Sequence, residues 1–230
     1  MLGSLTERSG SAALAETFLN CLAGDDVRRQ IVTEVVSVAV NHVGEDTPLG
    51  EFARTAVELD EYFPGDPSIL AALMLNRVHL KPGQALSVPP GLMHSYLSGT
   101  GIEIMADSNN VVRGGLTNKH IDIDSLIQIV SFQTQEPRII VAEEVDPGMR
   151  VFPGIDDQFR LWQLDLDTTC PAMMPASELA RILLITDGYA VCSGSHGTDE
   201  IVRGQAVWIP AGERVQIDGD CDGFIAAAGL

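Results

Sequence analysis

The chain has 230 residues, of which 45% are hydrophobic and 20% are charged, and its formal net charge is −18. A chain of this length can bury a sizeable core in one or two domains. Its 14 lysines and arginines are outnumbered by 32 acidic residues spread along the chain, which argues against a basic surface for nucleic acid or anionic lipid. We therefore expect neither nucleic acid nor a membrane as a partner.

The N-terminal residues and the cysteines indicate a compartment. The first residues lack the basic and apolar segments of a secretory signal, and no apolar run approaches the roughly 20 residues that span a bilayer. The cysteines lack the C-x-x-C spacing of a structural zinc site. We expect reduced, mostly buried thiols in a cytoplasmic protein. These cysteines are Cys21, Cys170, Cys192 and Cys221.

Residues 1–76 have a helical pattern. Apolar positions recur at helical spacing from Ser11 to Leu22, and Asp25 is placed to cap a second helix. Thr47-Pro48 and Asp66-Pro67 each place a capping side chain before a proline, which predicts two further helices.

From Arg77 the apolar residues alternate with polar ones, as they do in strands. The runs 94–97 and 101–106 predict strands, and residues 122–130 predict a short helix. Short strands then continue to the C-terminus. Turn signals lie between them at Asp187-Gly188, Ser193-Gly194 and Asp222-Gly223.

A twelve-residue frame occurs twice in this second region. Residues 83–94 read G-x5-P-x-G-x2-H, and residues 204–215 repeat the frame, with Val215 in the place of His94. The glycines and the proline indicate a tight turn. The residue that starts the returning strand, His94 or Val215, is then expected to point into a barrel. We interpret the copies as two related β-barrel modules, one functional and one degenerate. The alternative is a pair of ordinary hairpins with a common turn.

Several side chains around the first copy are candidates for a site. His94 is a candidate metal ligand, because imidazole suits zinc, and Tyr96 shares its face of a strand. Arg113 precedes two glycines, and a guanidinium binds phosphate or an enediolate oxygen with two hydrogen bonds. Lys119 would add a second positive charge. Glu103 fits a general base, a hydrogen-bond partner or a solvated carboxylate.

Each candidate also has a simpler interpretation. A histidine after such a turn is often a hydrogen-bonded structural residue, and Arg113 alone would fit a surface turn. Lys119 fits a solvated lysine before a helix equally well. The other histidines have no ligand spacing with His94; of these, His79 alternates out of phase with its apolar neighbours and is expected to face solvent.

The longer pattern favours a site. His94-x-Tyr96, followed by Asn-Val-Val-Arg-Gly-Gly-Leu-Thr at residues 110–117, resembles the type I mannose-6-phosphate isomerases of the cupin superfamily. The resemblance implies a mixed, mainly β fold, with cupin (double-stranded β-helix or jelly-roll) barrels and an N-terminal helical segment. It divides the chain into a partial helical domain at 1–76, the C-terminal half of a first cupin barrel at 77–145, and a second, degenerate cupin barrel at 146–230.

The resemblance also implies a reaction. These isomerases interconvert mannose 6-phosphate and fructose 6-phosphate by zinc-assisted proton transfer between C1 and C2, through a cis-enediol. By resemblance, His94 is a metal ligand and Arg113, Lys119 and Glu103 are catalytic. Tyr96, Arg113 and Lys119 would bind a phosphorylated hexose. A role in carbohydrate metabolism, including GDP-mannose biosynthesis, would follow.

Part of the family's zinc site has no counterpart in the sequence. The family holds zinc with further ligands from a Gln-x-His-Pro strand and a downstream glutamate, and this chain has no Gln-x-His or His-x-His sequence. His94 is thus the one expected zinc ligand present. We expect the C-terminal portion of a longer isomerase, impaired or inactive alone. The alternatives are a non-catalytic sugar- or phosphosugar-binding cupin that has lost its metal site, and another cupin enzyme, which would usually draw two or three histidines from one barrel.

Overall fold

The computed structural model describes residues 10–108, 110–154 and 157–229, so residues 1–9 of the predicted helical domain lie outside it. The chain forms two compact units. One contains the chain up to Val78 with 88–97 and 109–136, and the other contains 79–87, 98–108 and the chain from Pro137. The predicted half-barrel at 77–145 thus contributes segments to both units, and the three-part domain division stays a prediction.

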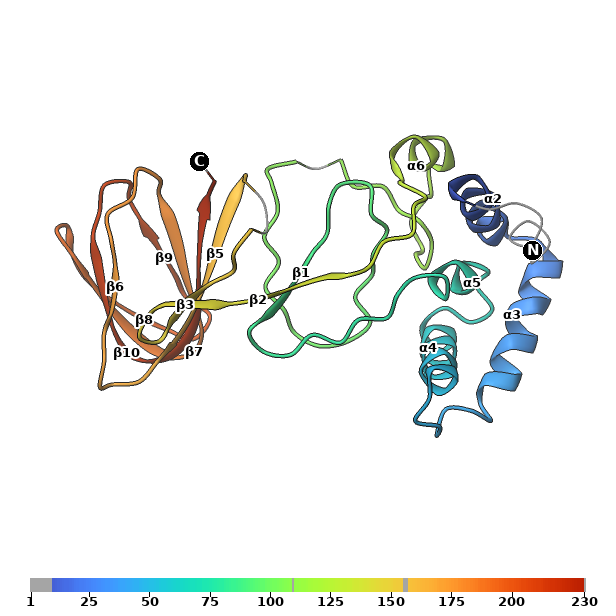
Figure 1. Ribbon diagram of the computed structural model, residues 1–230, viewed down its shortest axis with the longest axis horizontal. Helices are drawn as coiled ribbons and strands as arrows, with labels where there is room; N and C mark the ends of the chain where they lie inside the picture. The colour runs from blue at the N-terminus through green and yellow to red at the C-terminus, as the bar shows by residue number, and fades with distance from the viewer. Residues whose placement is uncertain (1–9, 109, 155–156, 230) are drawn as a thin grey trace. The chain divides into compact units, whose positions relative to one another are not determined.

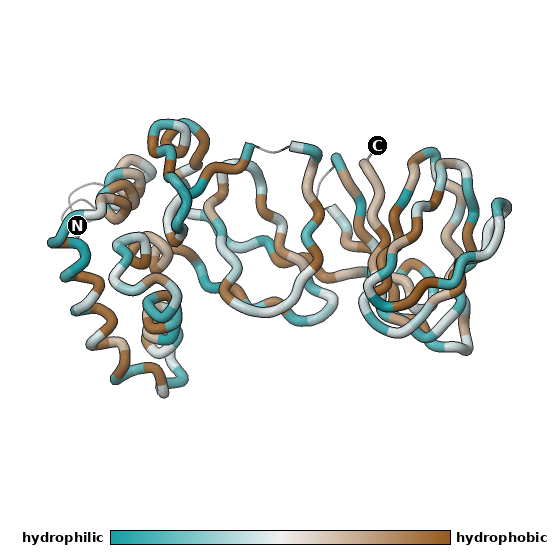
Figure 2. The backbone as a smooth tube through the Cα atoms, turned by 180° about the vertical axis from the view of Figure 1, so that it is seen from behind, coloured by the Kyte–Doolittle hydropathy of each residue, from teal (hydrophilic) through white to brown (hydrophobic). Residues whose placement is uncertain are grey.

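The first unit is built from helices and irregular segments (Figure 1). Its second helix carries both apolar and polar residues along its length (Figure 2), and Val32 and Ala39 are the buried ones. The helices are α2 (Ser11–Leu22), α3 (Asp26–Ala39), α4 (Pro48–Tyr62), α5 (Ser68–Ala72) and α6 (Ile123–Ile129).

The predicted helix caps at Asp25 and Thr47 are present, whereas the prediction for Asp66 is wrong, because α5 begins at Ser68 after Pro67 and has no side-chain cap. The Asp25 carboxylate accepts a hydrogen bond from the Arg28 backbone N–H at 2.9 Å, and the Thr47 hydroxyl oxygen accepts one from the Gly50 N–H at 3.1 Å. Asp122 caps α6 in the same way. These bonds satisfy N–H groups that have no partner within the helix, so local sequence fixes where these helices begin.

The core of the first unit joins helices to the irregular segments. Phe18 of α2 packs on Phe132 with ring centroids 5.6 Å apart, and Leu126 of α6 is 1% exposed. Partly buried residues from 93–97 and 112–121 pack against the same cluster. The two segments that carry the sequence motifs are therefore held by one hydrophobic core.

The second unit is a β-structure (Figure 1). Its eight-stranded sheet has the order β3-β4-β5-β10-β7-β8, with β6 paired to β10 and β9 paired to β7, and β1 and β2 form a separate antiparallel pair. The strands are β1 (Gln84–Ser87), β2 (Arg138–Val141), β3 (Glu143–Asp146), β4 (Met149–Val151), β5 (Phe159–Leu166), β6 (Ala172–Met174), β7 (Arg181–Gly194), β8 (Gly197–Val202), β9 (Ala206–Ile209) and β10 (Val215–Ala228).

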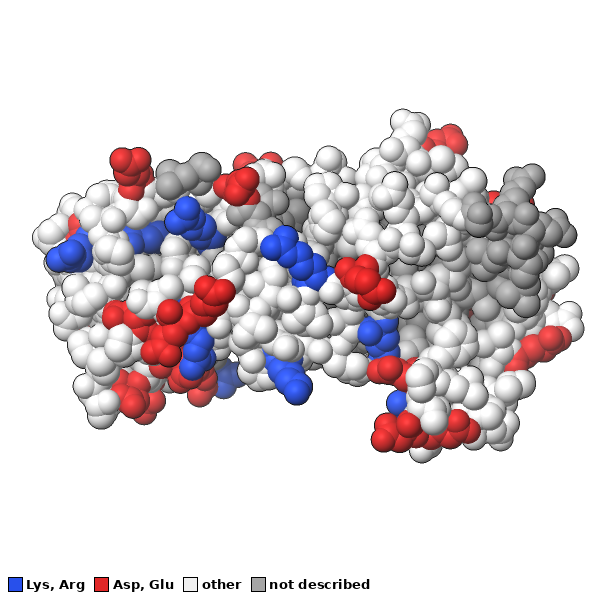
Figure 3. All heavy atoms as spheres, in the orientation of Figure 1, with Lys and Arg blue, Asp and Glu red and all other residues white. Residues whose placement is uncertain are grey.

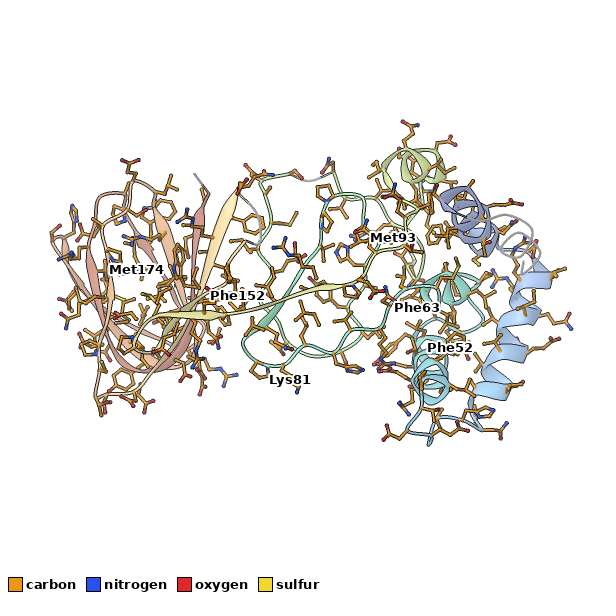
Figure 4. All side chains as sticks on the ribbon, in the orientation of Figure 1. Phe52, Phe63, Lys81, Met93, Phe152 and Met174 are labelled. Atoms are coloured by element: carbon orange, nitrogen blue, oxygen red, sulfur yellow. The ribbon has the colours of Figure 1, made fainter. Side chains whose placement is uncertain are left out.

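The strands of this sheet bury alternate residues. Ile217 and Ile225 of β10 and Leu164 of β5 are completely buried, and Met174 lies in the same core (Figure 4). Burial of each such aliphatic side chain stabilises the fold by about 2 kcal/mol. Two charged residues of this unit, Arg181 and Glu213, are buried as well.

Two strand predictions and two turn predictions are wrong. Residues 94–97 and 101–106 form no strand, because a ladder needs a paired neighbour, which a local pattern cannot supply. Asp187-Gly188 and Asp222-Gly223 lie inside β7 and β10, where the pairing shifts in a β-bulge. A bulge uses the same glycine freedom as a turn, so the two have similar sequence signals.

The glycines of the repeated frame have the same φ in both copies. Gly83 and Gly204 have φ values of 79° and 83°, and Gly91 and Gly212 both have φ of 81°. Each of these positions lies in the left-handed region that favours glycine.

The turn hydrogen bonds also match. The Gln84 backbone N–H donates to the Lys81 carbonyl at 2.9 Å, and the Gln205 N–H donates to the Val202 carbonyl at 2.9 Å. Each glutamine side-chain oxygen then accepts the backbone N–H of the same partner, at 2.9 and 3.1 Å respectively. The two copies thus share the geometry of the turn as well as its sequence, and both interpretations, related modules and ordinary hairpins with a common turn, stay predictions.

None of the helices among the described residues is long and apolar enough to cross a membrane. On the face that Figure 3 shows, basic side chains lie scattered among acidic ones. All four cysteines are free, and three of them are buried. Burial raises the pKa of Cys192 and of Cys221 to about 11, so these two thiols stay protonated at neutral pH.

Candidate functional site

A fixed turn precedes His94. The Leu92 N–H donates to the Pro89 carbonyl at 3.2 Å, and the Gly91 carbonyl accepts the Ser131 N–H at 2.9 Å. A side chain at Gly91 would place its Cβ 2.7 Å from the Ile129 carbonyl oxygen. The turn therefore packs backbone to backbone on the segment after α6, and only glycine allows that approach.

The imidazole of His94 is held in one tautomer. Its Nδ1 lies 3.0 Å from the Leu92 carbonyl oxygen, and a carbonyl only accepts, so Nδ1 carries the proton. Nε2 then keeps its lone pair. Metal-binding histidines commonly donate their other N–H to a carbonyl in this way. His94 is exposed, so its Nε2 is able to bind a metal ion or accept a proton.

Tyr96 lies beside His94. The two ring centroids are 6.3 Å apart with the planes at 88°, an edge-to-face arrangement. The tyrosine is 75% exposed. The expected proximity of these two side chains is present, although the segment pairs with no strand.

The Arg-Gly-Gly segment packs beneath the His94 motif. A Cβ at Gly114 would lie 2.1 Å from the terminal methyl of Met93, the residue before His94 (Figure 4). Gly115 has φ of 126°, and its Cβ would lie 2.5 Å from the Ser68 Cβ in α5. The two glycines thus let this segment approach other protein groups closely.

The structure places the remaining candidates on the surface. Arg113 and Lys119 are exposed residues of the first unit, and the Lys119 N–H donates to the Thr117 hydroxyl at 3.1 Å. Glu103 is exposed in the second unit. His79 is exposed, as its phase in the sequence predicted. The site roles of His94, Tyr96, Glu103, Arg113 and Lys119 stay predictions.

The donor set is too small for a complete zinc site. Within the described residues, no three histidine, cysteine, aspartate or glutamate side chains come together as a metal-binding group. Tight zinc binding needs several positioned ligands. His94 has the geometry of one ligand, and the described residues do not complete the set.

The structure contains one polar cluster that was not predicted from the sequence. Glu213 is 6% exposed, and its carboxylate accepts hydrogen bonds from the backbone N–H and hydroxyl of Ser195, and contacts His196 Nδ1 at 2.9 Å. The Ser195 hydroxyl bond is the main cause that lowers the pKa of Glu213. The buried guanidinium of Arg181 donates to the Glu213 carbonyl at 2.5 Å.

This cluster ties the β7–β8 turn to the turn before β10. It is not arranged as a nucleophile triad, because the same imidazole nitrogen, Nδ1 of His196, lies near both the serine hydroxyl and the carboxylate. Its signal in the sequence was a glutamate, Glu213, where the first copy of the frame has Leu92.

No family model matches the chain. Among curated proteins, the probable mannose-6-phosphate isomerase of Caenorhabditis elegans is 31% identical over 212 residues, which are 91% of this chain and 50% of that protein. Mannose-6-phosphate isomerase of Escherichia coli is 33% identical over 172 residues, 73% of this chain and 43% of that protein. The chain spans about half the length of the curated relatives it matches.

Solved structures give the same result. A mutant of phosphomannose isomerase from Salmonella typhimurium matches 96% of this chain and 56% of its own length, with a TM-score of 0.76 and 26% identity. Mannose 6-phosphate isomerase from the same organism, bound to fructose 6-phosphate and zinc, matches 96% of this chain and 55% of its own length, with a TM-score of 0.75 and 26% identity.

The mainly β, cupin-type fold with N-terminal helices is therefore confirmed. The predicted resemblance is confirmed as well: over nearly its whole length, the chain is similar to about half of a mannose-6-phosphate isomerase.

Proposed function

We propose that this chain carries part of the active site of an aldose–ketose isomerase that interconverts mannose 6-phosphate and fructose 6-phosphate. One observation carries the proposal: 96% of the chain matches an isomerase structure that holds fructose 6-phosphate and zinc. The packing of Met93 against Gly114 supports it, because this contact couples the His94 motif to the Arg113 motif.

In this proposal His94 provides one zinc ligand through Nε2. Zinc, when bound, polarises an oxygen of the sugar and stabilises negative charge on it. The described residues supply too few donors to hold the ion tightly, so the other ligands must come from elsewhere. We expect weak zinc binding by the chain alone.

The other proposed roles use charge and position. A proton leaves C2 of the aldose and a proton is delivered to C1, with negative charge on oxygen between the two transfers. Arg113 would hold that oxygen or the phosphate with two hydrogen bonds, and Lys119 would add positive charge. Tyr96 would line the same face as His94. Glu103, a carboxylate of the second unit, has its catalytic role from the resemblance alone.

The test is an isomerase assay on the purified 230-residue chain, with mannose 6-phosphate and added zinc and a chelator control. We expect any turnover to be chelator-sensitive and to fall in His94→Gln and Arg113→Gln. The exposed His79→Ala is the matched control and should keep the wild-type rate.

Binding separates the proposal from its alternative. If turnover is absent, fructose 6-phosphate is titrated into the labelled chain while the backbone resonances of 93–97 and 110–119 are followed by NMR. Saturable shifts that Arg113→Gln abolishes, without turnover, would favour a non-catalytic phosphosugar-binding cupin. If the chain shows no turnover and fructose 6-phosphate causes no saturable shifts, the proposal is overturned. A cytoplasmic location and a place in carbohydrate metabolism, including GDP-mannose biosynthesis, stay predictions.

A further inference from the structure

We propose a further small-molecule site on the second unit, one that takes a neutral polyhydroxylated compound of monosaccharide size, such as an unphosphorylated hexose. The site is a cavity of about 340 Å³, which suits a small ligand. It lies where the turn before β1 meets strands β4, β5, β7 and β10, all within one compact unit. The residues that line it include Gly83, Arg150, Gln163, Asp165, Asp222 and Phe224.

Strand pairing brings these side chains to one face. Gln163 of β5 lies opposite Arg150 of β4 on one side and Phe224 of β10 on the other. Asp165 and Asp222 are paired two residues further along. Side chains directly opposite one another share a face, and so do residues two apart in a strand. The intervening Leu164 is fully buried in the core, so the row faces away from the barrel interior.

The side-chain oxygen of Gln163 indicates a missing hydrogen-bond donor. Oε1 is buried and has no hydrogen-bond partner within the described part of the chain. The vacant Cβ position of Gly83 lies 3.7 Å from it. Buried polar atoms in folded proteins nearly always have a partner, either in the protein or an ordered water, so this oxygen beside the cavity is an acceptor that a water or a ligand hydroxyl would satisfy. A sugar hydroxyl is such a donor.

The charges in the cavity favour a neutral ligand. Arg150, which would attract an anion, pairs with Asp165 at 3.5 Å. Burial, followed by the charges of Asp165, Asp187 and Asp220, raises the pKa of Asp222. A phosphate would be repelled by these carboxylates, whereas sugar hydroxyls donate hydrogen bonds to them. A bound divalent cation is disfavoured, because the described residues gather no three-donor metal group.

Phe224 supplies an apolar wall. Its ring is partly buried against a cluster that includes Ile140, Phe152 and Leu161, and it also lines the cavity. A hexose ring has an apolar C–H face and a polar rim of hydroxyls. One aromatic wall opposite amide and carboxylate oxygens therefore matches both sides of such a ligand.

The test is an NMR titration of the labelled 230-residue chain with D-mannose, and in parallel with mannose 6-phosphate and with magnesium chloride. We expect D-mannose to shift the resonances of Gly83, Gln163 and Phe224 in a saturable way. Gln163→Leu keeps the side chain's size and removes the acceptor, and should weaken binding about tenfold or more. Gln216→Leu, an exposed glutamine on β10 outside the cavity, is the matched control and should bind as wild type does.

Other results would overturn the proposal. The absence of saturable shifts with D-mannose would do so, and so would equal shifts with mannose 6-phosphate, or shifts with magnesium ions alone. If Gln163→Leu does not fold, the titration of the wild-type chain with D-mannose still shows whether the site binds a neutral sugar. This site takes neutral sugar and is read at residues of the second unit, so its failure is distinct from failure of the proposed isomerase function, which is read at residues of the first unit with phosphorylated sugar.

Discussion

Replacing Gly91 by alanine, with Gly212→Ala as its partner, tests whether the turn before His94 is fixed by packing. Both glycines have φ of 81°. At Gly212 nothing lies within 4 Å of the added methyl group, whereas at Gly91 the methyl would lie 2.7 Å from the Ile129 carbonyl oxygen. The two substitutions therefore share a conformational cost and differ in one contact.

The shared cost is small. A left-handed alanine costs about 1–2 kcal/mol, and its less flexible unfolded chain returns about 0.4–1 kcal/mol, which leaves about 1 kcal/mol for Gly212→Ala. In Gly91→Ala the turn must also move by about 0.7 Å (3.4 − 2.7) to reach ordinary van der Waals contact. That movement weakens the bond from Ser131 N–H to the Gly91 carbonyl and adds about 1–2 kcal/mol. We expect a total of about 2–3 kcal/mol.

The assay is hydrogen exchange measured by mass spectrometry, because it resolves the two units of one chain. Peptides around residues 126–132 report Gly91→Ala, and peptides around 213–217 report Gly212→Ala, each against the wild-type chain. Equal losses of protection free energy for the two variants would refute the reasoning, since the Ile129 contact would then contribute nothing.

Three further predictions concern packing and charge. Gly115→Ala should destabilise the first unit by about 2 kcal/mol, because its methyl meets a side-chain carbon of α5 at a left-handed φ; hydrogen exchange of α5 would show it. Arg181→Met should lower the urea midpoint of the second unit by the equivalent of about 2 kcal/mol, because it strips the donors from the carbonyls of Pro175 and Glu213. Tryptophan fluorescence reports that unit, and an unchanged midpoint would contradict the prediction. The lowered pKa of Glu213 gives stability that is present above its unfolded value of about 4.3 and is lost as pH falls through the folded value. Urea midpoints measured at a series of acid pH values should fall in the wild-type chain as Glu213 is protonated. The part of this fall that is due to Glu213 should be absent in Glu213→Gln.

The features that the sequence predicted well are local ones. Asp25 and Thr47 cap helices because the cap and its N–H partner lie three residues apart, and this spacing is visible in the chain. The repeated frame was visible for the same reason, because Gly91 and Gly212 each need a φ that glycine tolerates.

The features that the sequence did not show depend on partners far away in the chain. Residues 94–97 have the alternation of a strand but pair with no strand in the described structure. The Glu213 cluster joins residues 17 and 18 positions apart, so no local pattern marks it. Asp222-Gly223 looked like a turn because a bulge and a turn make the same demand on glycine, and only the pairing partner distinguishes them.

The two copies of the frame have the same turn but a different residue at the last position. Both copies form the same turn, with glycines of the same φ and glutamine hydrogen bonds of the same kind. The turn therefore does not determine whether the residue after it is a metal ligand or a core residue. The two copies differ at the last position: His94 is exposed, with its Nδ1 on the Leu92 carbonyl, whereas Val215 is 5% exposed in a hydrophobic core. Because Val215 belongs to the packed interior of its barrel, a histidine there would have to be buried, and its ring nitrogens would need new partners. In the second unit, this position therefore contributes to packing of the core and not to a metal site.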